Sequence, residues 1–530
     1  MGAAHRAAPN PFMIWRFVAK HMAKVLFLGT LVAVSIYVCI FLLTKGMVVP
    51  ALMPLVGSGL ISYIFLSEKR YPLRWLVPGL IFLAVMVVYP IGYTIVSSFT
   101  NVGTGHMLSR AQAIDQLLDR SYAPEGALTY SYAAFADGEG NIALVLTADD
   151  EHILFVDGET SAIAVDDARL IDEDADGDPE AFEDYRRLTI AEIVPLLSEL
   201  EAYQIEYEGQ RIALTDLSSF QTRAPLYVYD ETAETMTDQT TGVVYTAVEG
   251  VFTAQDGTEI YPGYKVSVGF RNYVRLITNP QIAGPFAKVF VWTFLFALLT
   301  TILNFTLGLG TAILLNDPFL KFRTLYRVLM VIPYALPAFI TILVWQGMLN
   351  EHFGIINRML VWIFGESARV PWLADALWAK ISILLVNLWL GYPYMMLISL
   401  GSLQSIPGSL FEAARVDGAR WWQQFWRITL PLLLMPLGPL LVGTFAFNFN
   451  NFTLIYLLTE GGPAIANSMT PAGATDILIS YTYNLAFQGD RGNQFGLAAA
   501  VSVLIFLIIG TISAINFRMT GALEELSKNV

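Results

Sequence analysis

The chain has 530 residues, of which 55% are hydrophobic and 14% charged, and its mean hydropathy of +0.53 excludes an ordinary soluble protein and predicts several membrane-spanning helices. Its single cysteine, Cys39, excludes an internal disulfide framework and a metal cluster built from cysteines. The net charge of −14 conceals an acidic stretch, residues 101–275, which carries −23 against +9 for the remainder, so no basic face predicts a nucleic-acid partner.

Eight apolar stretches are each long enough to span a bilayer as a helix, which takes about 20 residues. They lie at residues 24–44, 47–66, 74–98, 286–315, 325–349, 377–402, 428–458 and 494–517. We therefore predict a polytopic α-helical membrane protein of about eight transmembrane helices, with a large extracytoplasmic insert between the third and the fourth. Its parts are residues 1–100 with an N-terminal tail and helices 1–3, the insert at 101–275, and a core at 276–530 with helices 4–8.

The basic residues predict the orientation, because cytoplasmic loops carry an excess of Lys and Arg. If the N-terminus is cytoplasmic, 15 of the 21 basic residues outside the insert face the cytoplasm. Both termini are therefore predicted to be cytoplasmic, and residues 101–275 to lie on the other side of the membrane.

The insert, at about 175 residues, is long enough for a core of its own. Two of its segments, residues 111–121 and 179–203, have helical patterns. Five others have the composition of strands, some separated by Asp-Gly turns, and they lie at residues 141–147, 152–156, 225–229, 242–245 and 265–270. We predict an α+β or sandwich-like domain whose acidic surface meets a soluble partner.

One acidic loop in the insert, Asp172 to Glu183, has the alternating oxygen ligands and the central glycine of a calcium-binding loop. Pro179, however, stands where such a loop has an apolar residue, and no clear helix precedes the loop. We interpret it as an ordinary acidic turn and predict no metal site, with calcium binding as the alternative.

Two of the apolar stretches carry a polar stripe along one helical face, because its members recur at i, i+3, i+4 and i+7. The stripes consist of Asn387, Leu390, Gly391 and Tyr394 in the sixth stretch, and of Thr444, Phe447, Asn448 and Asn451 in the seventh. An unpaired Asn is costly in hydrocarbon, so these faces point into the protein or into a water-filled cavity. Amides, hydroxyls and rings without any charge favour a neutral sugar as ligand. The alternative is hydrogen bonding between helices.

The segment between these two stretches, residues 406–431, is predicted to form a helix-turn-helix on the cytoplasmic face. A short helix carries Glu412 to Asp417, Gly418 permits a sharp turn, and a second helix merges into the next span. Such a shape fits a cleft in a partner protein, and the alternative is a solvated connecting loop.

The spacing of Glu412-Ala413-Ala414, Gly418 and Ile428-Thr429-Leu430-Pro431 resembles the EAA loop of permease subunits of ABC importers. The longer stretch from about residue 382 to 518 resembles the MalF-like family of maltose/maltodextrin permease subunits. The phrases that carry this resemblance are Asn387-Leu-Trp-Leu-Gly-Tyr-Pro-Tyr, Phe445-Ala-Phe-Asn-Phe-Asn-Asn-Phe, Thr459-Glu-Gly-Gly-Pro, Thr470-Pro-Ala-Gly-Ala-Thr-Asp and Phe495-Gly-Leu-Ala-Ala-Ala.

The resemblance implies a subunit that forms the pathway for maltose and maltodextrins through a bacterial inner membrane, with the insert in the periplasm. Its implied partners are a second, MalG-like permease, two copies of a MalK-like ATPase and a soluble periplasmic maltose-binding protein. The two stripes would form the sugar site, with Thr444 at a position where one member of the family has serine. The residues implied to couple the permease to its ATPase are Glu412, Ala413, Ala414, Asp417 and Gly418, with Glu412 facing a basic group and Gly418 as the pivot.

The chain itself is predicted not to be an enzyme and to carry no cofactor. It has no phosphate-binding P-loop, since the dipeptide Gly-Lys is absent, so ATP and Mg²⁺ are expected on the partner ATPase.

Other classes of protein explain the sequence less well. A secondary transporter needs buried ionisable residues for ion coupling, and clear buried carboxylates are absent from the predicted spans. A membrane-anchored sensor would explain the insert but not the two stripes. A permease for trehalose, another disaccharide or a sugar alcohol fits the same residues and stays open.

Overall fold

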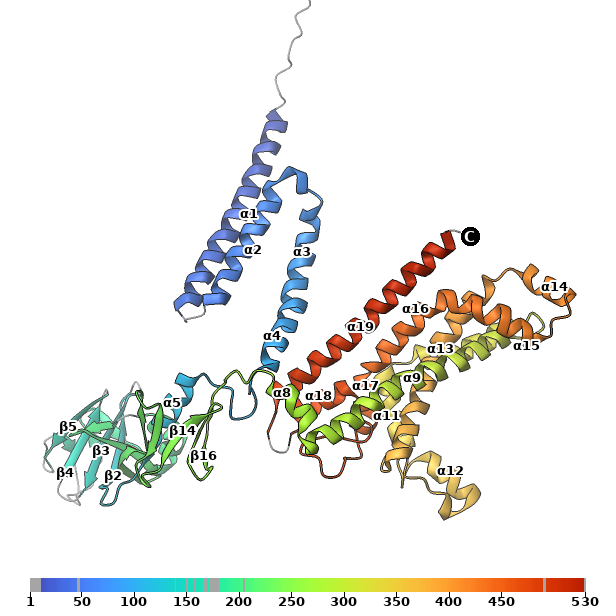
Figure 1. Cartoon of the computed structure of the whole chain (residues 1–530). Helices are drawn as coiled ribbons and strands as arrows, with labels where there is room; N and C mark the ends of the chain where they lie inside the picture. The colour runs from blue at the N-terminus through green and yellow to red at the C-terminus, as the bar shows by residue number, and fades with distance from the viewer. Residues whose placement is uncertain are drawn as a thin grey trace, which may run out of the picture. The chain divides into compact units, whose positions relative to one another are not determined.

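The computed structural model describes residues 11–528 except 45–47, 139, 149–150, 157, 165–166, 168, 172–180, 204 and 490–491. It forms two compact units, Met1–Val96 and Ser97–Val530. Figure 1 shows the chain coloured from its N-terminus to its C-terminus. Most of the acidic loop from Asp172 to Glu183 lies outside the described residues.

The first unit is built from apolar helices: α1 (Pro11–Thr44), α2 (Val48–Leu66), α3 (Leu73–Leu83), a π-helical turn (Ala84–Val88) and the start of α4 (Tyr89–Ser98). α1 and α2 pack against each other as a hairpin. Arg74, at the start of α3, donates hydrogen bonds to the carbonyls of Ile64 (3.4 Å) and Ser67 (3.1 Å). These bonds fix the turn between α2 and α3.

The insert contains two antiparallel sheets. The first has 11 strands with the central order β5-β4-β3-β2-β11-β10-β9, and the second has five strands, β12 to β16, in chain order. The strands of the first sheet are β1 (Ser121–Tyr122), β2 (Thr129–Ala136), β3 (Ile142–Ala148), β4 (Glu151–Val156), β5 (Glu159–Ile163), β6 (Leu170–Ile171), β7 (Ala181–Phe182), β8 (Tyr185–Arg187), β9 (Ile205–Tyr207), β10 (Gln210–Asp216) and β11 (Ser219–Pro225). Those of the second are β12 (Tyr227–Asp230), β13 (Thr235–Asp238), β14 (Val244–Val248), β15 (Val251–Thr253) and β16 (Glu259–Ile260).

Short helices accompany these sheets: α5 (Arg110–Leu118), α6 (Ile190–Ile193), a 3₁₀ turn (Val194–Leu196) and α7 (Leu197–Leu200). Each sheet has its own core. Ala113 and Leu117 of α5 pack with Phe252 of the smaller sheet, whereas Leu144 and Phe220 belong to the core of the larger one. The expected mixture of helices and strands is therefore present.

Two details of the predicted insert are wrong. Of the segment 179–203, the described residues 181–203 are helical only from Ile190 onward, because β7 and β8 precede the capping box in which Glu192 accepts from the Thr189 N–H. Residues 265–270 form no strand and make a single bridge between Ser267 and Thr100. The reason is that the Asn101 side chain, rather than a neighbouring strand, accepts the Val266 N–H (2.8 Å).

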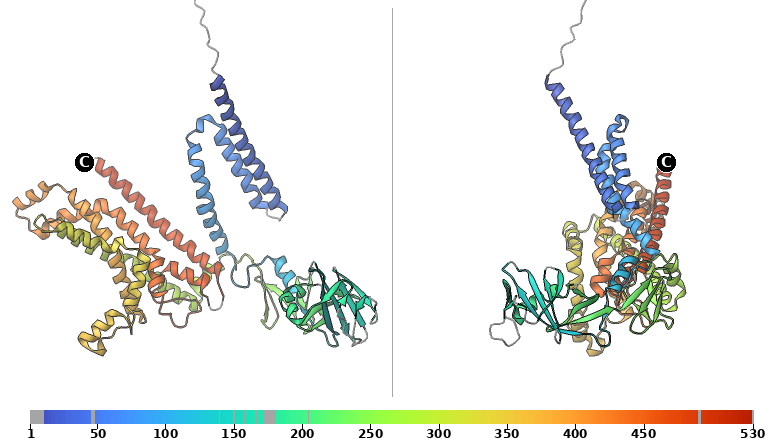
Figure 2. Two further views of the ribbon diagram at one scale, coloured as in Figure 1. Left: turned by 180° about the vertical axis from the view of Figure 1, so that it is seen from behind. Right: turned by 90° about the vertical axis from the view of Figure 1, so that its left-hand side faces the viewer.

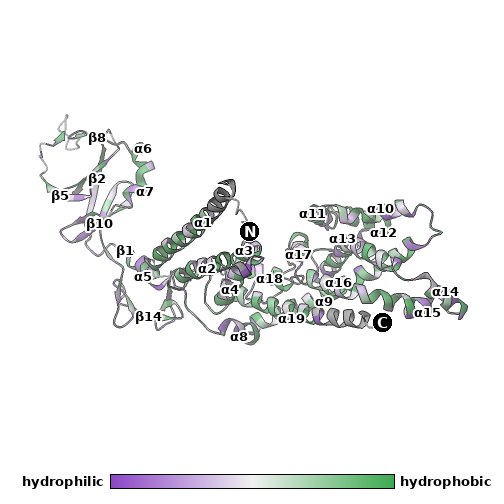
Figure 3. Ribbon diagram, turned by 90° about the horizontal axis from the view of Figure 1, so that it is seen from above, coloured by the Kyte–Doolittle hydropathy of each residue, from purple (hydrophilic) through white to green (hydrophobic). Residues whose placement is uncertain are grey.

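The core of the second unit is helical. Its elements are α8 (Arg271–Thr278), α9 (Pro280–Asn316), α10 (Arg323–Ala335), α11 (Ala338–Met348), α12 (Ile355–Phe364), a 3₁₀ turn (Glu366–Ala368), α13 (Ala376–Gln404), α14 (Gly408–Val416), α15 (Trp421–Gln424), a π-helical turn (Phe425–Thr429), α16 (Leu430–Phe449), α17 (Phe452–Thr459), α18 (Leu478–Phe487) and α19 (Phe495–Lys528). α9, α13 and α16 pack against one another, and the left view of Figure 2 shows them running side by side. Figure 3 shows that hydrophobic residues dominate these long helices.

Within the described residues, six helices are long and apolar enough to cross a membrane. They are Lys24–Thr44, Leu73–Ser98, Pro280–Asn316, Ala376–Gln404, Trp421–Phe449 and Phe495–Asn516. The bent pair α10–α11 has the same length and apolar character when it is taken as one unit, and the predicted second span corresponds to a shorter apolar helix, Ala51–Leu66. The polytopic helical fold with a large β-rich insert is thus confirmed.

Two predicted spans are not continuous helices. The fifth bends by 89° between α10 and α11. Leu336 is extended there, with φ −81° and ψ 144°, because the following Pro337 disfavours the α conformation. Pro337 therefore accounts for the break between α10 and α11. The seventh span ends at Phe449, and Asn451 begins α17 as a new helix by accepting the Leu454 N–H.

α9 and α13 approach each other closely at Gly308. A Cβ atom there would stand 2.7 Å from the Met396 nitrogen and 2.8 Å from the Met395 carbonyl carbon. Gly310, by contrast, has open space around it. Of the two glycines in the Gly308-x-Gly310 pair, only Gly308 is required for helix packing.

Candidate functional site

A cavity of about 660 Å³ lies between the bent pair α10–α11 and helices α9, α13, α16 and α17. All eight residues of the two predicted stripes line it: Asn387, Leu390, Gly391, Tyr394, Thr444, Phe447, Asn448 and Asn451. Other lining residues include Asn304 from α9, Tyr334 from α10 and Ile342 from α11. The structure therefore brings the two stripes together at one site, and their binding of a sugar stays a prediction.

Three buried asparagines, one each from α9, α13 and α16, form a hydrogen-bonded chain in the cavity wall. Asn304 Nδ2 donates to Asn387 Oδ1 (3.0 Å), and Asn387 Nδ2 donates to Asn448 Oδ1 (2.9 Å). Asn448 Nδ2 in turn donates to the carbonyl of Thr444 (2.9 Å). The three asparagines are only 2%, 5% and 2% exposed, in chain order. Hydrogen bonding between helices, the alternative role of the stripes, is therefore present.

This chain of amides leaves capacity for a ligand. A carboxamide has two N–H donors and two acceptor lone pairs, and Asn387 uses one of each in the bonds described above. Asn448 likewise accepts one hydrogen bond and donates one. Each amide can therefore hold neighbouring helices together and still bond to a hydroxyl group in the cavity.

Asn304 fits against α13 because residue 391 is a glycine. A Cβ atom at Gly391 would stand 2.8 Å from the Cγ of Asn304 and 3.0 Å from its Oδ1, closer than van der Waals contact. Asn304 Oδ1 has no hydrogen-bond partner in the described part of the chain. Asn304 belongs to neither predicted stripe, although an Asn within an otherwise apolar stretch is a signal of an inward-facing polar group.

Aromatic rings and the absence of charge set the chemistry of the cavity. Tyr394 stacks on Tyr334 with ring centroids 6.4 Å apart and an interplanar angle of 25°. Phe447 is 69% exposed, so its ring is open to a ligand. Among the described lining residues there is no Asp, Glu, Lys, Arg or His. These features suit a neutral solute with both hydroxyl groups and apolar faces.

The predicted helix-turn-helix between the stripes is present. α14 ends at a turn, and α15 continues through the π-helical turn into α16. Gly418 has a φ of +79°, a left-handed conformation that favours glycine, and its N–H donates to the Arg415 carbonyl (3.1 Å). The next residue closes the turn as its N–H donates to the Ala414 carbonyl (2.8 Å).

The surface of this hairpin is available to a partner. The side chains of Glu412 and Asp417 are exposed, as are Ala413 and Gly418, while Ala414 is half-buried. In the second arm Trp421 and Trp422 contact each other edge to face and are also exposed. Carboxylates and large rings together form a surface that a basic and partly apolar cleft would complement, and their coupling role stays a prediction.

A buried aspartate joins two of the motifs noted in the sequence, Thr459-Glu-Gly-Gly-Pro and Thr470-Pro-Ala-Gly-Ala-Thr-Asp. Asp476 accepts hydrogen bonds from the Gly473 N–H (2.7 Å), the Ser480 hydroxyl (2.6 Å) and Asn484 Nδ2 (3.2 Å). Any Cβ atom at Gly461 would overlap its carboxylate. Burial raises the pKa of Asp476 to about 6, although these hydrogen bonds act to lower it. The two motifs thus form one folded loop, which lies between the long apolar helices Trp421–Phe449 and Phe495–Asn516 and outside both.

An uncharged cavity within a bundle of spans, a protruding helix-turn-helix and a large β-rich insert together define the permease subunit of a membrane transporter. Residues 304–520 match the binding-protein-dependent transport system inner membrane component, and residues 81–159 match the N-terminal part of the TM subunit in PBP-dependent ABC transporters. The chain is therefore a multi-pass inner membrane protein of this class.

Proteins of similar sequence identify the family within this class. The chain is 36% identical over 519 residues to the maltose/maltodextrin transport system permease protein MalF of Vibrio vulnificus (strain YJ016), with 96% of each chain covered. It is also 36% identical to MalF of Escherichia coli (strain K12), over 96% of this chain and 97% of that one. A chain of a bacterial ABC transporter involved in the import of the acidic polysaccharide alginate covers 48% of this chain and 84% of its own length, at 24% identity and a TM-score of 0.41. The protein belongs to the MalF family of ABC importer permeases, as its motifs predict.

Proposed function

We propose that this chain, together with a second MalG-like permease, forms the translocation pathway of an ABC importer for maltose and maltodextrins. The observation that carries the proposal is the convergence of two polar, uncharged stripes on one cavity. Sugars present hydroxyl groups and apolar ring faces, which amides and aromatic rings complement. The relatives named as maltose/maltodextrin permeases support this choice of substrate.

Different lining residues contact different parts of the sugar. The spare N–H groups and lone pairs of Asn387 and Asn448 bond to hydroxyls, and the exposed ring of Phe447 packs on an apolar sugar face. Tyr394 supplies a hydroxyl that has no hydrogen-bond partner in the described part of the chain, and Leu390 and Gly391 shape the wall. Thr444 and Asn451 bond within the protein, to the Leu440 carbonyl and the Leu454 N–H, and turn their remaining lone pairs to the cavity.

Energy for transport comes from partners. Two copies of a MalK-like ATPase bind ATP and Mg²⁺, and this chain is not an enzyme and holds no cofactor. The hairpin formed by α14 and α15 faces the cytoplasm, as do both chain termini, and docks into the ATPase through Glu412 and the turn at Gly418. On the periplasmic side, the acidic insert receives a soluble maltose-binding protein.

The mechanism that follows is alternating access. Closure of the ATPase pair moves the hairpin, and the hairpin is joined directly to α13 and α16, which carry the two stripes. The cavity then opens outward, receives the sugar from the binding protein and closes after hydrolysis. The break between α10 and α11 stands at the cavity wall, since Leu336 and Ala338 both line it.

The test is the ATPase activity of the reconstituted complex with its binding protein, measured with maltose, longer maltodextrins, trehalose and sucrose. We expect several-fold stimulation by maltose and maltodextrins alone. Stimulation by a different sugar would replace the substrate but retain the importer. Activity that depends on neither sugar nor binding protein would refute the proposed function.

A further inference from the structure

The link between α11 and α13 contains a helix whose outer face is apolar. α12 turns Ile356 and Asn357 toward the protein and exposes Ile355, Met359 and Trp362. Trp362 is 86% exposed, and the neighbouring Ile363 and Phe364 are exposed as well. Burying one large apolar side chain is worth about 1.5–3 kcal/mol, so a face of this kind is costly to leave in water.

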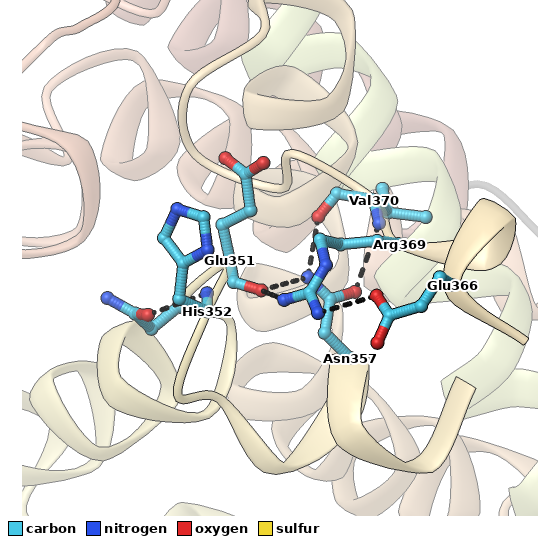
Figure 4. A network of polar contacts seen from close by, with 7 residues as sticks. Glu351, His352, Asn357, Glu366, Arg369 and Val370 are labelled. Atoms are coloured by element: carbon cyan, nitrogen blue, oxygen red, sulfur yellow. Dashed lines mark hydrogen bonds and ion pairs between the residues drawn. The ribbon is translucent and has the colours of Figure 1, made fainter. Parts of the chain in front are cut away.

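A hydrogen-bonded frame fixes this orientation (Figure 4). Asn357 is 1% exposed, and its Nδ2 donates to the carbonyls of Glu351 (2.9 Å) and Val370 (2.8 Å). Its Oδ1 accepts the Val370 N–H (3.1 Å) and the Trp372 indole N–H (3.0 Å). Because Asn357 is bonded on both sides, α12 cannot rotate to hide its apolar face.

Charged groups complete the frame away from that face. Arg369 donates to the Glu351 carbonyl (3.0 Å) and forms an ion pair with Glu366 (2.8 Å), as Figure 4 shows. Asn350 Oδ1 accepts the backbone N–H groups of His352 (3.0 Å) and Phe353 (2.9 Å) at the start of the link. The polar groups are thus gathered at the ends of α12, and Arg358 is the one charged residue within the helix itself.

The chain places this helix next to the membrane. Six residues separate the end of α11 from the start of α12, a link that reaches at most about 20 Å. α12 has ten residues and is therefore about 15 Å long, too short to cross a hydrocarbon core of about 30 Å. With α9 counted as one crossing and the bent pair α10–α11 as another, α12 stands on the same side of the membrane as the insert.

We propose that α12 lies flat in the membrane–water interface on the side of the insert and binds the phospholipid bilayer through Ile355, Met359, Trp362 and Ile363. The composition fits this occupant, since Trp is enriched at membrane interfaces and Arg358 can extend to a lipid headgroup. Because the chain on either side of α12 continues into a span, the helix is held close to the membrane. The rigid frame around Asn357 would then transmit the position of the interface to the second turn of α13, because Ser382 Oγ donates to the Trp372 carbonyl (3.0 Å).

The test measures the depth of single labels. Cys39, the single natural cysteine, is replaced by serine, and cysteine is introduced at Met359 or at Ile363 and labelled with a small environment-sensitive fluorophore. Ser367→Cys, at an exposed position in the polar turn after α12, is the matched control. The full chain is studied in its assembled transporter, in nanodiscs whose phospholipids are brominated near the headgroup or near the end of the acyl chain.

We expect bromines near the headgroup to reduce the fluorescence at Met359 and Ile363 roughly two-fold, and aqueous iodide to have little effect. The Ser367 label should respond to iodide and not to bromine. Iodide quenching at Met359 and Ile363 would show a water-exposed face and overturn the proposal. Protection from both quenchers would show that a protein subunit covers the face, and stronger quenching by deep bromines would show a helix that re-enters the bilayer. Either result would also overturn it.

Discussion

The main effect that we expect from replacement of Asn387 by alanine is a loss of stability of the helix bundle, with altered sugar recognition as a secondary effect. Asn387 links α9 to α16, and its removal leaves Asn304 Nδ2 without its acceptor and Asn448 Oδ1 without its donor. An interhelical hydrogen bond in a membrane protein is worth about 0.6–1.7 kcal/mol, and a buried polar group left unpaired costs about 1–3 kcal/mol. With two bonds lost, we expect Asn387→Ala to lower the free energy of unfolding by about 2–4 kcal/mol.

The assay is thermal unfolding of the assembled transporter in nanodiscs, followed by maltose uptake in proteoliposomes. Tyr394→Phe is the matched control, since it removes a cavity hydroxyl that has no hydrogen-bond partner in the described part of the chain. The control should unfold at the wild-type temperature and should weaken sugar-dependent uptake alone. An Asn387→Ala variant with unchanged thermal stability and reduced uptake would refute the structural role of the asparagine chain.

Three further substitutions test separate parts of the molecule. Gly391→Ala should displace Asn304 and cost about 1–3 kcal/mol of stability, as overpacked cores do, whereas Gly310→Ala, in open space, should cost nothing measurable by the same thermal assay. The pKa of Asp476, about 6 in the folded chain against about 3.9 in an unfolded one, means that the folded state binds the proton more tightly. Stability should therefore fall by about 3 kcal/mol as pH rises from about 4 through 6, and Asp476→Asn, compared with wild type at each pH, should lack that fall. Gly418→Asp should leave the subunit inserted but abolish sugar-stimulated ATPase activity, and normal activity would contradict a coupling role. Gly418→Asn, of similar size but uncharged, separates the effect of charge from that of bulk.

The hydropathy pattern was sufficient for the approximate position of the apolar helices, although among the described residues six rather than eight are single helices long enough to cross a membrane. A membrane span must satisfy its own backbone hydrogen bonds, so a long apolar stretch has few alternatives to a helix. The spacing of the two stripes also follows from the geometry of a single helix, which is why Asn387 and Asn448 could be assigned to inward faces. The turn at Gly418 was equally local, since it depends on one residue that tolerates a positive φ.

Contacts between distant segments were decided by the tertiary structure alone. Asn304 looked like part of an ordinary packed helix until α9 was placed against Gly391, 87 positions further along the chain. Residues 265–270 do not form the expected strand because the side chain of Asn101, far away in sequence, accepts the Val266 N–H that a β-ladder would use. Asp476 became a loop anchor only because Gly461 leaves room for its carboxylate.

The helical period alone was thus enough to assign the inward faces of the two stripes, because it places residues i, i+3, i+4 and i+7 on one side of a single helix. Which residues of different helices meet could be learned only from the fold, since a hydrogen bond such as that between Asn304 and Asn387 depends on the packing of two helices. The same holds for the outward face of α12. Its apolar composition is visible in the sequence, but its fixed exposure results from the bonds that Asn357 makes to both sides of the link.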